Sequence, residues 1–144
     1  MDARSGGDRG SASLELVIWG PVLLLIVSVI IYAGRVAQAG LTVESAAGEA
    51  ARAATVADNR AQANTRAEAA AAAALSSAGL KCASVSVSVD TSEWNRPAGQ
   101  PARAEATVSC RVALGDLIGP GLIPGSRVVS STATSALDTF RTRP

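Results

Sequence analysis

The sequence predicts an α+β protein with a long N-terminal transmembrane helix, a second alanine-rich helix and a small antiparallel sheet. Three observations lead to this fold class: an uncharged apolar run from Leu16 to Gly34, an alanine-rich stretch after it, and later runs in which apolar and polar residues alternate. We expect a leader at 1–10, the first helix over 11–57, the second helix over 58–79 and a disulfide-bearing β domain at 80–144.

The composition excludes several classes of function. The 144 residues include no histidine, and 13 Lys+Arg stand against 12 Asp+Glu, for a net charge of +1. Without histidine there is no Ser-His-Asp triad, no Cys-His pair and no imidazole metal ligand. The near-neutral charge argues against nucleic acid as a partner, and no CxxC, Walker loop or carboxylate cluster occurs. We therefore expect a protein that is not an enzyme and has no cofactor and no metal site.

The apolar run has the length of a membrane span. Its 19 residues rise about 1.5 Å each and extend roughly 29 Å, the thickness of the hydrocarbon core of a bilayer. Trp19 and Tyr32 lie near its ends, where amphipathic rings favour the membrane interface. Gly20 and Pro21 lie inside the run, and the proline predicts a helix kink. This kink is either a tolerated transmembrane proline or a weak point that unwinds when the subunit packs in an assembly.

The orientation in the membrane is only weakly encoded. Arginines both precede and follow the apolar run, so counting positive charges does not decide it. The short polar N-terminus favours an N-terminus inside the cell. We expect a single-pass protein of the cytoplasmic membrane with a C-terminal extracytoplasmic domain of about 110 residues.

Three kinds of N-terminal processing fit the sequence. Ala37-Gln38-Ala39 matches the A-x-A cleavage pattern of a secretory signal peptide, and an uncleaved membrane anchor is the second alternative. The third rests on the stretch GSASLE, Gly10 to Glu15, which resembles a type IV prepilin processing site. In such a site a membrane aspartyl peptidase cuts after Gly10, so that Ser11 becomes the mature N-terminus and Glu15 its fifth residue.

Glu15 has two interpretations. A carboxylate one turn inside the membrane edge can remain in the headgroup region at small cost. In a filament of packed helices, in contrast, a carboxylate away from lipid needs a cationic partner. The α-amino group of Ser11 in a neighbouring subunit would supply that partner and help to set the axial register between subunits.

A second helix is expected after a break at 58–59. Seventeen of the 33 residues from Ala46 to Ala78 are alanine, which reflects either genomic composition or close packing of helices. Two capping boxes are candidates for the start of the second helix, Asn59 with Gln62 and Thr65 with Glu68. The helix is expected to stop at Gly79, a residue suited to a left-handed cap.

Alternating residues predict three strands. Val85, Val87 and Val89 alternate with serines, residues 104–112 alternate in the same way, and a third strand is plausible around 127–136. When the apolar faces of the first two strands are matched, Val85 pairs with Val108 and Val87 with Ala106. The apolar loop over 114–123 either covers the open end of the sheet or contacts a partner.

Cys82 and Cys110 flank the first hairpin and predict a disulfide in an exported domain, with a free thiol pair as the alternative. The matched register places Ala83, not Cys82, opposite Cys110, so the bridge needs a bulge or an irregular start of the strand at 81–82. Trp94, in the loop between these strands, is a possible contact residue. The alternative is that Trp94 folds back onto its own strands.

With these features together, the chain resembles the TadE-like proteins of Tad/Flp pilus systems, most closely over residues 9–54 in RGSASLELVIWGPVLLLIVSVIIYAGRVAQA and VESAAGEAARAA. The resemblance implies a type IV pilin-like fold and a minor pilin, or pseudopilin, cut by a prepilin peptidase after Gly10. Its implied partners are the major pilin, another pseudopilin and the inner-membrane assembly platform. Leu16 follows Glu15 where major Flp prepilins usually have an aromatic residue, which favours the pseudopilin branch. The alternative is a membrane-anchored or secreted binding domain unrelated to pili.

Overall fold

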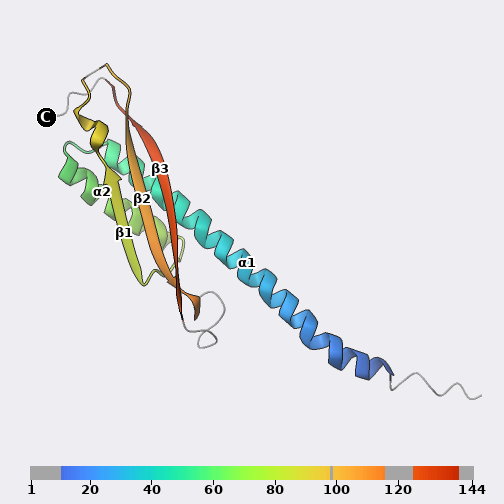
Figure 1. Ribbon diagram of the computed structural model, residues 1–144. Coiled ribbons are helices and arrows are strands. Elements are labelled where there is room, and N and C mark those ends of the chain that lie inside the picture. Colours follow the sequence, from blue (N-terminus) through green and yellow to red (C-terminus); the bar gives the residue numbers. More distant parts are fainter. Residues whose placement is uncertain (1–10, 98, 116–124, 140–144) are drawn as a thin grey trace, which may run out of the picture. The chain divides into compact units, whose positions relative to one another are not determined.

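The computed structural model describes residues 11–97, 99–115 and 125–139 (Figure 1). The elements follow one another as α1, α2, β1, the short 3-10 helix η1, β2 and β3. Contacts divide the chain into two compact units, Met1–Arg35 and Val36–Pro144. The observed elements confirm the predicted α+β class with its long apolar helix, second helix and three-stranded antiparallel sheet.

Helix α1 runs from Ser11 to Thr55 and contains Pro21 in its interior. It is long and apolar enough to cross a membrane by length and composition, with a candidate span at Val17–Thr55 and a mean hydropathy of 2.4. None of the side chains in the most apolar 18-residue window is buried inside the structure. A helix of this kind indicates membrane anchoring, because its apolar surface otherwise lies in water.

Helix α2, Arg60–Ser77, begins and ends with local caps. The Asn59 side chain accepts a hydrogen bond from Gln62 N (2.9 Å), and Gln62 Oε1 accepts one from Asp58 N (2.7 Å). Asn59 is therefore the N-cap, whereas the Thr65 hydroxyl bonds to Ala61 O inside the helix. At the other end Gly79 has φ +71°, and Leu80 N donates to Leu75 O (3.0 Å) in a Schellman motif.

The sheet has the order β1-β2-β3. Strands β1 (Ser84–Asp90) and β2 (Ala102–Ala113) are joined through η1 (Ser92–Asn95), and β3 is Ser126–Leu137. Every adjacent pair is antiparallel, and β2 pairs with β3 over its whole length.

The expected register of the first hairpin is wrong by two residues. Val85 lies opposite Cys110, not Val108, and Val87 lies opposite Val108, not Ala106. Ala83 consequently does not face Cys110. The first two strands keep their apolar residues on one face in either register, so the pattern of alternation alone cannot separate the two.

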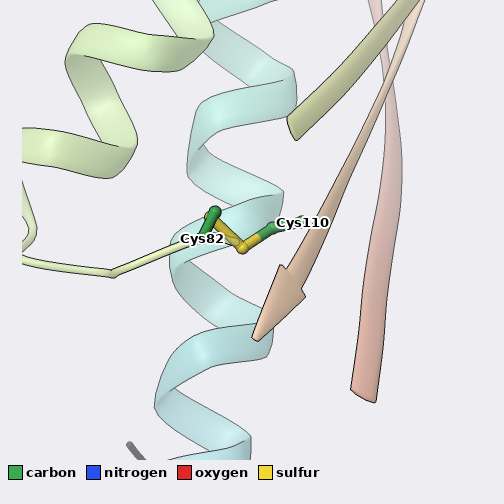
Figure 2. The surroundings of a disulfide bond; sticks show 2 residues. All are labelled: Cys82 and Cys110. Atoms are coloured by element: carbon green, nitrogen blue, oxygen red, sulfur yellow. A yellow bond between two sulfur atoms is a disulfide. The ribbon is translucent and has the colours of Figure 1, made fainter. Parts of the chain in front are cut away.

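The core of the 36–144 unit is built from small side chains. Among the described residues, the buried apolar set in α1 is Ala39, Val43, Ala46, Ala47, Ala50, Ala51 and Ala54, and the set in β2 is Ala102, Ala104, Ala106, Val108, Cys110 and Val112. Figure 1 shows the C-terminal part of α1 passing behind the sheet, and Figure 2 shows the same helix directly behind the end of β2. We name the face of the sheet that carries these buried β2 residues the inner face. Because alanine has so little volume, the layers can approach each other closely.

Candidate assembly segment and the disulfide-bearing sheet

The predicted processing and assembly residues lie at the start of the chain. Gly10 falls outside the described residues, whereas Ser11 is the first residue of α1 and Glu15 follows one turn later in the same helix. Cleavage at Gly10 and the pairing of Glu15 remain predictions.

The helix after Glu15 presents an exposed apolar surface. Its large apolar side chains are 44–71% exposed, namely Val17, Ile18, Trp19, Val22, Leu23, Leu24, Leu25, Ile26, Val27, Val29, Ile30 and Ile31. The Ser28 hydroxyl donates to Leu24 O (2.7 Å), so this polar group is satisfied within the helix itself. A continuous apolar surface of this size needs lipid or partner helices around it.

Gly20 and Pro21 are both inside α1, which continues beyond them. Proline has no N–H, so the carbonyl of Val17 loses its partner in the helical ladder. A side chain at Gly20 would meet nothing within 4 Å, so packing against the described residues does not require this glycine. The helix is locally weaker at Pro21 because proline lacks an N–H. That this weak point unwinds during assembly remains a prediction.

Cys82 and Cys110 form a disulfide, with their Cα atoms 5.5 Å apart (Figure 2). Cys110 is fully buried on the inner face of β2, and Cys82 lies before the first residue of β1. There Ala83 N donates to Arg111 O (2.7 Å), next to the regular pair of Ser84 with Arg111. The strand thus has an irregular start, which brings Cys82 to the inner face. The bond links the segment after α2 to the central strand.

Trp94 is 5% exposed and is the buried residue of η1. The structure therefore corresponds to the alternative in which this side chain folds back onto its own domain, and the indole is not available as a surface contact. The sequence alone could not decide between these alternatives, because a tryptophan in a turn-rich loop fits both.

The loop around Trp94 is organised by Glu93, which the sequence analysis missed. Glu93 Oε1 bonds to Arg96 Nη2 (2.8 Å), and Glu93 Oε2 accepts a hydrogen bond from Arg103 N (2.8 Å). Arg96 in turn donates to Pro101 O (3.0 Å). The available signal was the spacing of Glu93 and Arg96, since residues three apart meet on a helical turn.

Two further surface features appear only in three dimensions. A groove of about 780 Å³ lies between α1 and α2, lined by Leu41, Thr42, Ser45 and Glu49 and by small residues near the end of α2. On the outer face of the sheet, hydroxyl pairs bridge β2 and β3, Thr107 with Thr132 (2.9 Å) and Ser109 with Ser130 (2.8 Å). Among the described residues, no three His, Cys, Asp or Glu side chains lie together as metal ligands would.

Comparison with known protein families gives a match to the N-terminal part of the chain. Residues 10–52 match the family profile of the TadE-like proteins, a range that begins at Gly10, includes Glu15 and the apolar run, and ends before α2. No curated protein and no solved structure matches the chain. The match confirms the resemblance seen in the sequence: over this N-terminal segment the chain is similar to the TadE-like proteins.

Proposed function

We propose that this chain is a non-enzymatic minor pilin, or pseudopilin, of a Tad/Flp-type pilus or a related secretion machinery. The observation that carries the proposal is the TadE-like match over residues 10–52, which starts at the glycine of the GSASLE stretch. The long exposed apolar helix and the exported-type disulfide domain support it.

In this function a prepilin peptidase cuts after Gly10 on the cytosolic side of the membrane. The mature chain, beginning at Ser11, stays in the cytoplasmic membrane through α1, and its C-terminal domain lies outside. Assembly then packs the apolar surface of α1 against the same region of other subunits, with Glu15 paired to a neighbouring N-terminus. The partners are the prepilin peptidase, the major pilin, another pseudopilin and the inner-membrane platform.

The first test is the mature N-terminus of the protein isolated from its native host, determined by mass spectrometry. We expect a chain that begins at Ser11, and a Gly10→Val variant that keeps the leader, because sites of this kind are cut after glycine and valine adds a branched side chain there. A native chain beginning at Met1 would instead identify a fixed membrane anchor. One beginning at Gly40 would identify a secreted domain, and either result would overturn the pilin mechanism.

A further inference from the structure

The two edges of the sheet differ in how they are protected. Strand β1 has seven residues, ends at Asp90 and contacts α2, whereas β3 has twelve residues in uninterrupted pairing with β2. From Val128 to Leu137 the sequence of β3 has no charge, no proline and no glycine. Natural edge strands are usually shortened, charged, bulged or covered, because a long unprotected edge adds strands from other chains. The one charge of β3, Arg127, lies at the start of the strand opposite Val112, and the ten residues after it have none of the sequence features that prevent this.

The hydrogen-bonding groups of this edge can be assigned from the ladder. Leu114 N donates to Gly125 O (3.0 Å), and this pair continues the register of β2 with β3. Hydrogen-bonded pairs alternate in an antiparallel ladder, so the odd-numbered residues of β3 bond to β2. The backbone groups of the even-numbered residues therefore point away from the sheet: Val128, Ser130, Thr132, Thr134 and Ala136. Within the part of the chain that the structure describes, no hydrogen bond joins these groups to another segment.

The outer face next to this edge carries opposite charges at its two ends. Asp90 lies directly opposite Glu105, and Glu105 lies opposite Thr134. Like charges directly opposite each other destabilise a sheet. Arg103, opposite Ala136, lies on the same face beyond this pair, but no ion pair joins Glu105 to any described residue. At the other end Arg111, opposite Val128, reaches across to donate to Ser126 Oγ (3.3 Å). Between the two ends the face carries only hydroxyl groups, on Ser88, Thr107, Thr132, Ser86, Ser109 and Ser130.

We propose that the free edge of β3 is a docking site for an extended strand of a different protein chain, added antiparallel to β3. This strand has a basic side chain opposite Thr134, an acidic side chain opposite Val128 and uncharged residues between them. Neighbouring strands lie about 4.8 Å apart, so a lysine opposite Thr134 is within reach of Glu105 across β3. The edge supplies backbone hydrogen bonds and the two charged ends fix the direction of the added strand.

A second copy of this chain does not fit the edge. From Val128 to Leu137 the strand β3 has no charged residue, so a second β3 places neither a basic side chain opposite Thr134 nor an acidic side chain opposite Val128. The added strand therefore belongs to a different protein chain.

The test uses the full chain in detergent micelles and two synthetic peptides of equal composition, KSTVTSE and ESTVTSK. Amide hydrogen exchange of β3 is measured by NMR with and without about 1 mM peptide, a concentration suited to a short strand. We expect KSTVTSE, in the antiparallel arrangement, to slow exchange of the four outward amides that it spans, those of Val128, Ser130, Thr132 and Thr134, at least twofold, and ESTVTSK to slow it less. No slowing, equal slowing or stronger slowing by ESTVTSK would overturn the proposal.

Two variants test whether the peptide binds through the backbone groups of the β3 edge and through the charge of Glu105. Thr134→Pro removes one outward N–H without touching the ladder to β2, so we expect it to lose peptide binding while its near-UV circular dichroism stays unchanged. Glu105→Gln is expected to reduce the difference between the two peptides without abolishing it, because Arg111 still favours the peptide with glutamate opposite Val128. If the outward amides already exchange slowly without peptide, and the protein has the mass of a dimer, a second copy occupies the edge. The proposed partner would then be wrong. The N-terminus of the mature chain is independent of these results, so the two proposals can fail separately.

Discussion

Glu15 is the residue whose substitution best separates an assembly subunit from a fixed membrane anchor. In the proposed filament its carboxylate pairs with the α-amino group of a neighbouring Ser11, whereas in a fixed anchor it lies at the headgroups without a partner. We expect Glu15→Ala to abolish copurification with pilus components while the protein still inserts into the membrane. Copurification from solubilised host membranes, with membrane fractionation of the same cells, measures both.

The matched control is Glu44→Ala, an exposed glutamate further along α1. Its side chain makes no hydrogen bond or ion pair with the described residues, so its loss is expected to leave copurification unchanged. Equal effects of both substitutions would show that a general loss of negative charge on α1, and not the position of Glu15, is responsible.

Single residues were predictable where their role depends on sequence neighbours. Asn59 caps α2 through Gln62, and Gly79 takes the left-handed conformation at its end, as the sequence indicates. Both roles depend on backbone groups within four residues, which a sequence displays directly. Trp94 could not be placed in this way, because its burial depends on packing that the local sequence does not specify.

At the scale of elements, substitution of Gly48 and of Gly79 by alanine is expected to change the stability of the protein in opposite directions. Gly79 has φ +71° at the end of α2, and Gly48 lies inside α1; a side chain at either position meets nothing within 4 Å. We expect Gly79→Ala to lower stability by about 1 kcal/mol, because alanine is strained in the left-handed region. Gly48→Ala is expected to raise stability by about 0.5–1 kcal/mol, because alanine favours the helix.

Thermal unfolding of the full chain in detergent, followed by near-UV circular dichroism, measures this contrast. Differences of this size shift Tm by several degrees in a domain of about 100 residues. If Gly79→Ala were neutral, the cap would not limit the stability of α2, and the Schellman geometry would have no energetic role in holding its end.

The elements themselves were easier to predict than their pairing. Apolar length identified α1, and alternation identified β1, β2 and β3 to within two residues at most ends, because each pattern reflects one repeating geometry. The register of β1 with β2 failed, because a slip of two residues keeps every side chain on its original face. The unprotected edge of β3 could not be predicted from the sequence either, because the order of strands in the sheet decides which strand is outermost.

At the scale of the whole molecule, the 36–144 unit has an unusually weak apolar core. Among its described residues, thirteen of the twenty buried apolar ones are alanine, and the largest fully buried side chains are Val43, Val108, Val112 and Cys110. Burying one methyl or methylene group contributes about 0.8 kcal/mol, whereas a full leucine or valine side chain contributes about 1.5–3 kcal/mol. Covalent linkage therefore matters more here than in a domain with large buried side chains.

The disulfide is accordingly expected to decide whether this unit stays folded. It closes a loop of sequence separation 28, for which chain entropy predicts a stabilisation of roughly 3–4 kcal/mol. This is a large share of the 5–15 kcal/mol by which domains are typically stable. We expect the double variant Cys82→Ser with Cys110→Val to lower the free energy of unfolding by that amount, measured as a lower midpoint of guanidinium unfolding. Valine at position 110 preserves an apolar side chain in the buried site, so the loss reports the bond and not a cavity.

The single variant Cys110→Ala with Cys82 retained is the comparison, because it breaks the bond and also leaves a void on the inner face of β2. It should lose more stability than the double variant by about 1 kcal/mol or more. If the double variant unfolds at the same denaturant concentration as the native chain, the bond does not hold α2 and the sheet together. The alanine-lined contact between α1 and the inner face of the sheet would then be sufficient by itself, and reduction of the disulfide would have no structural consequence.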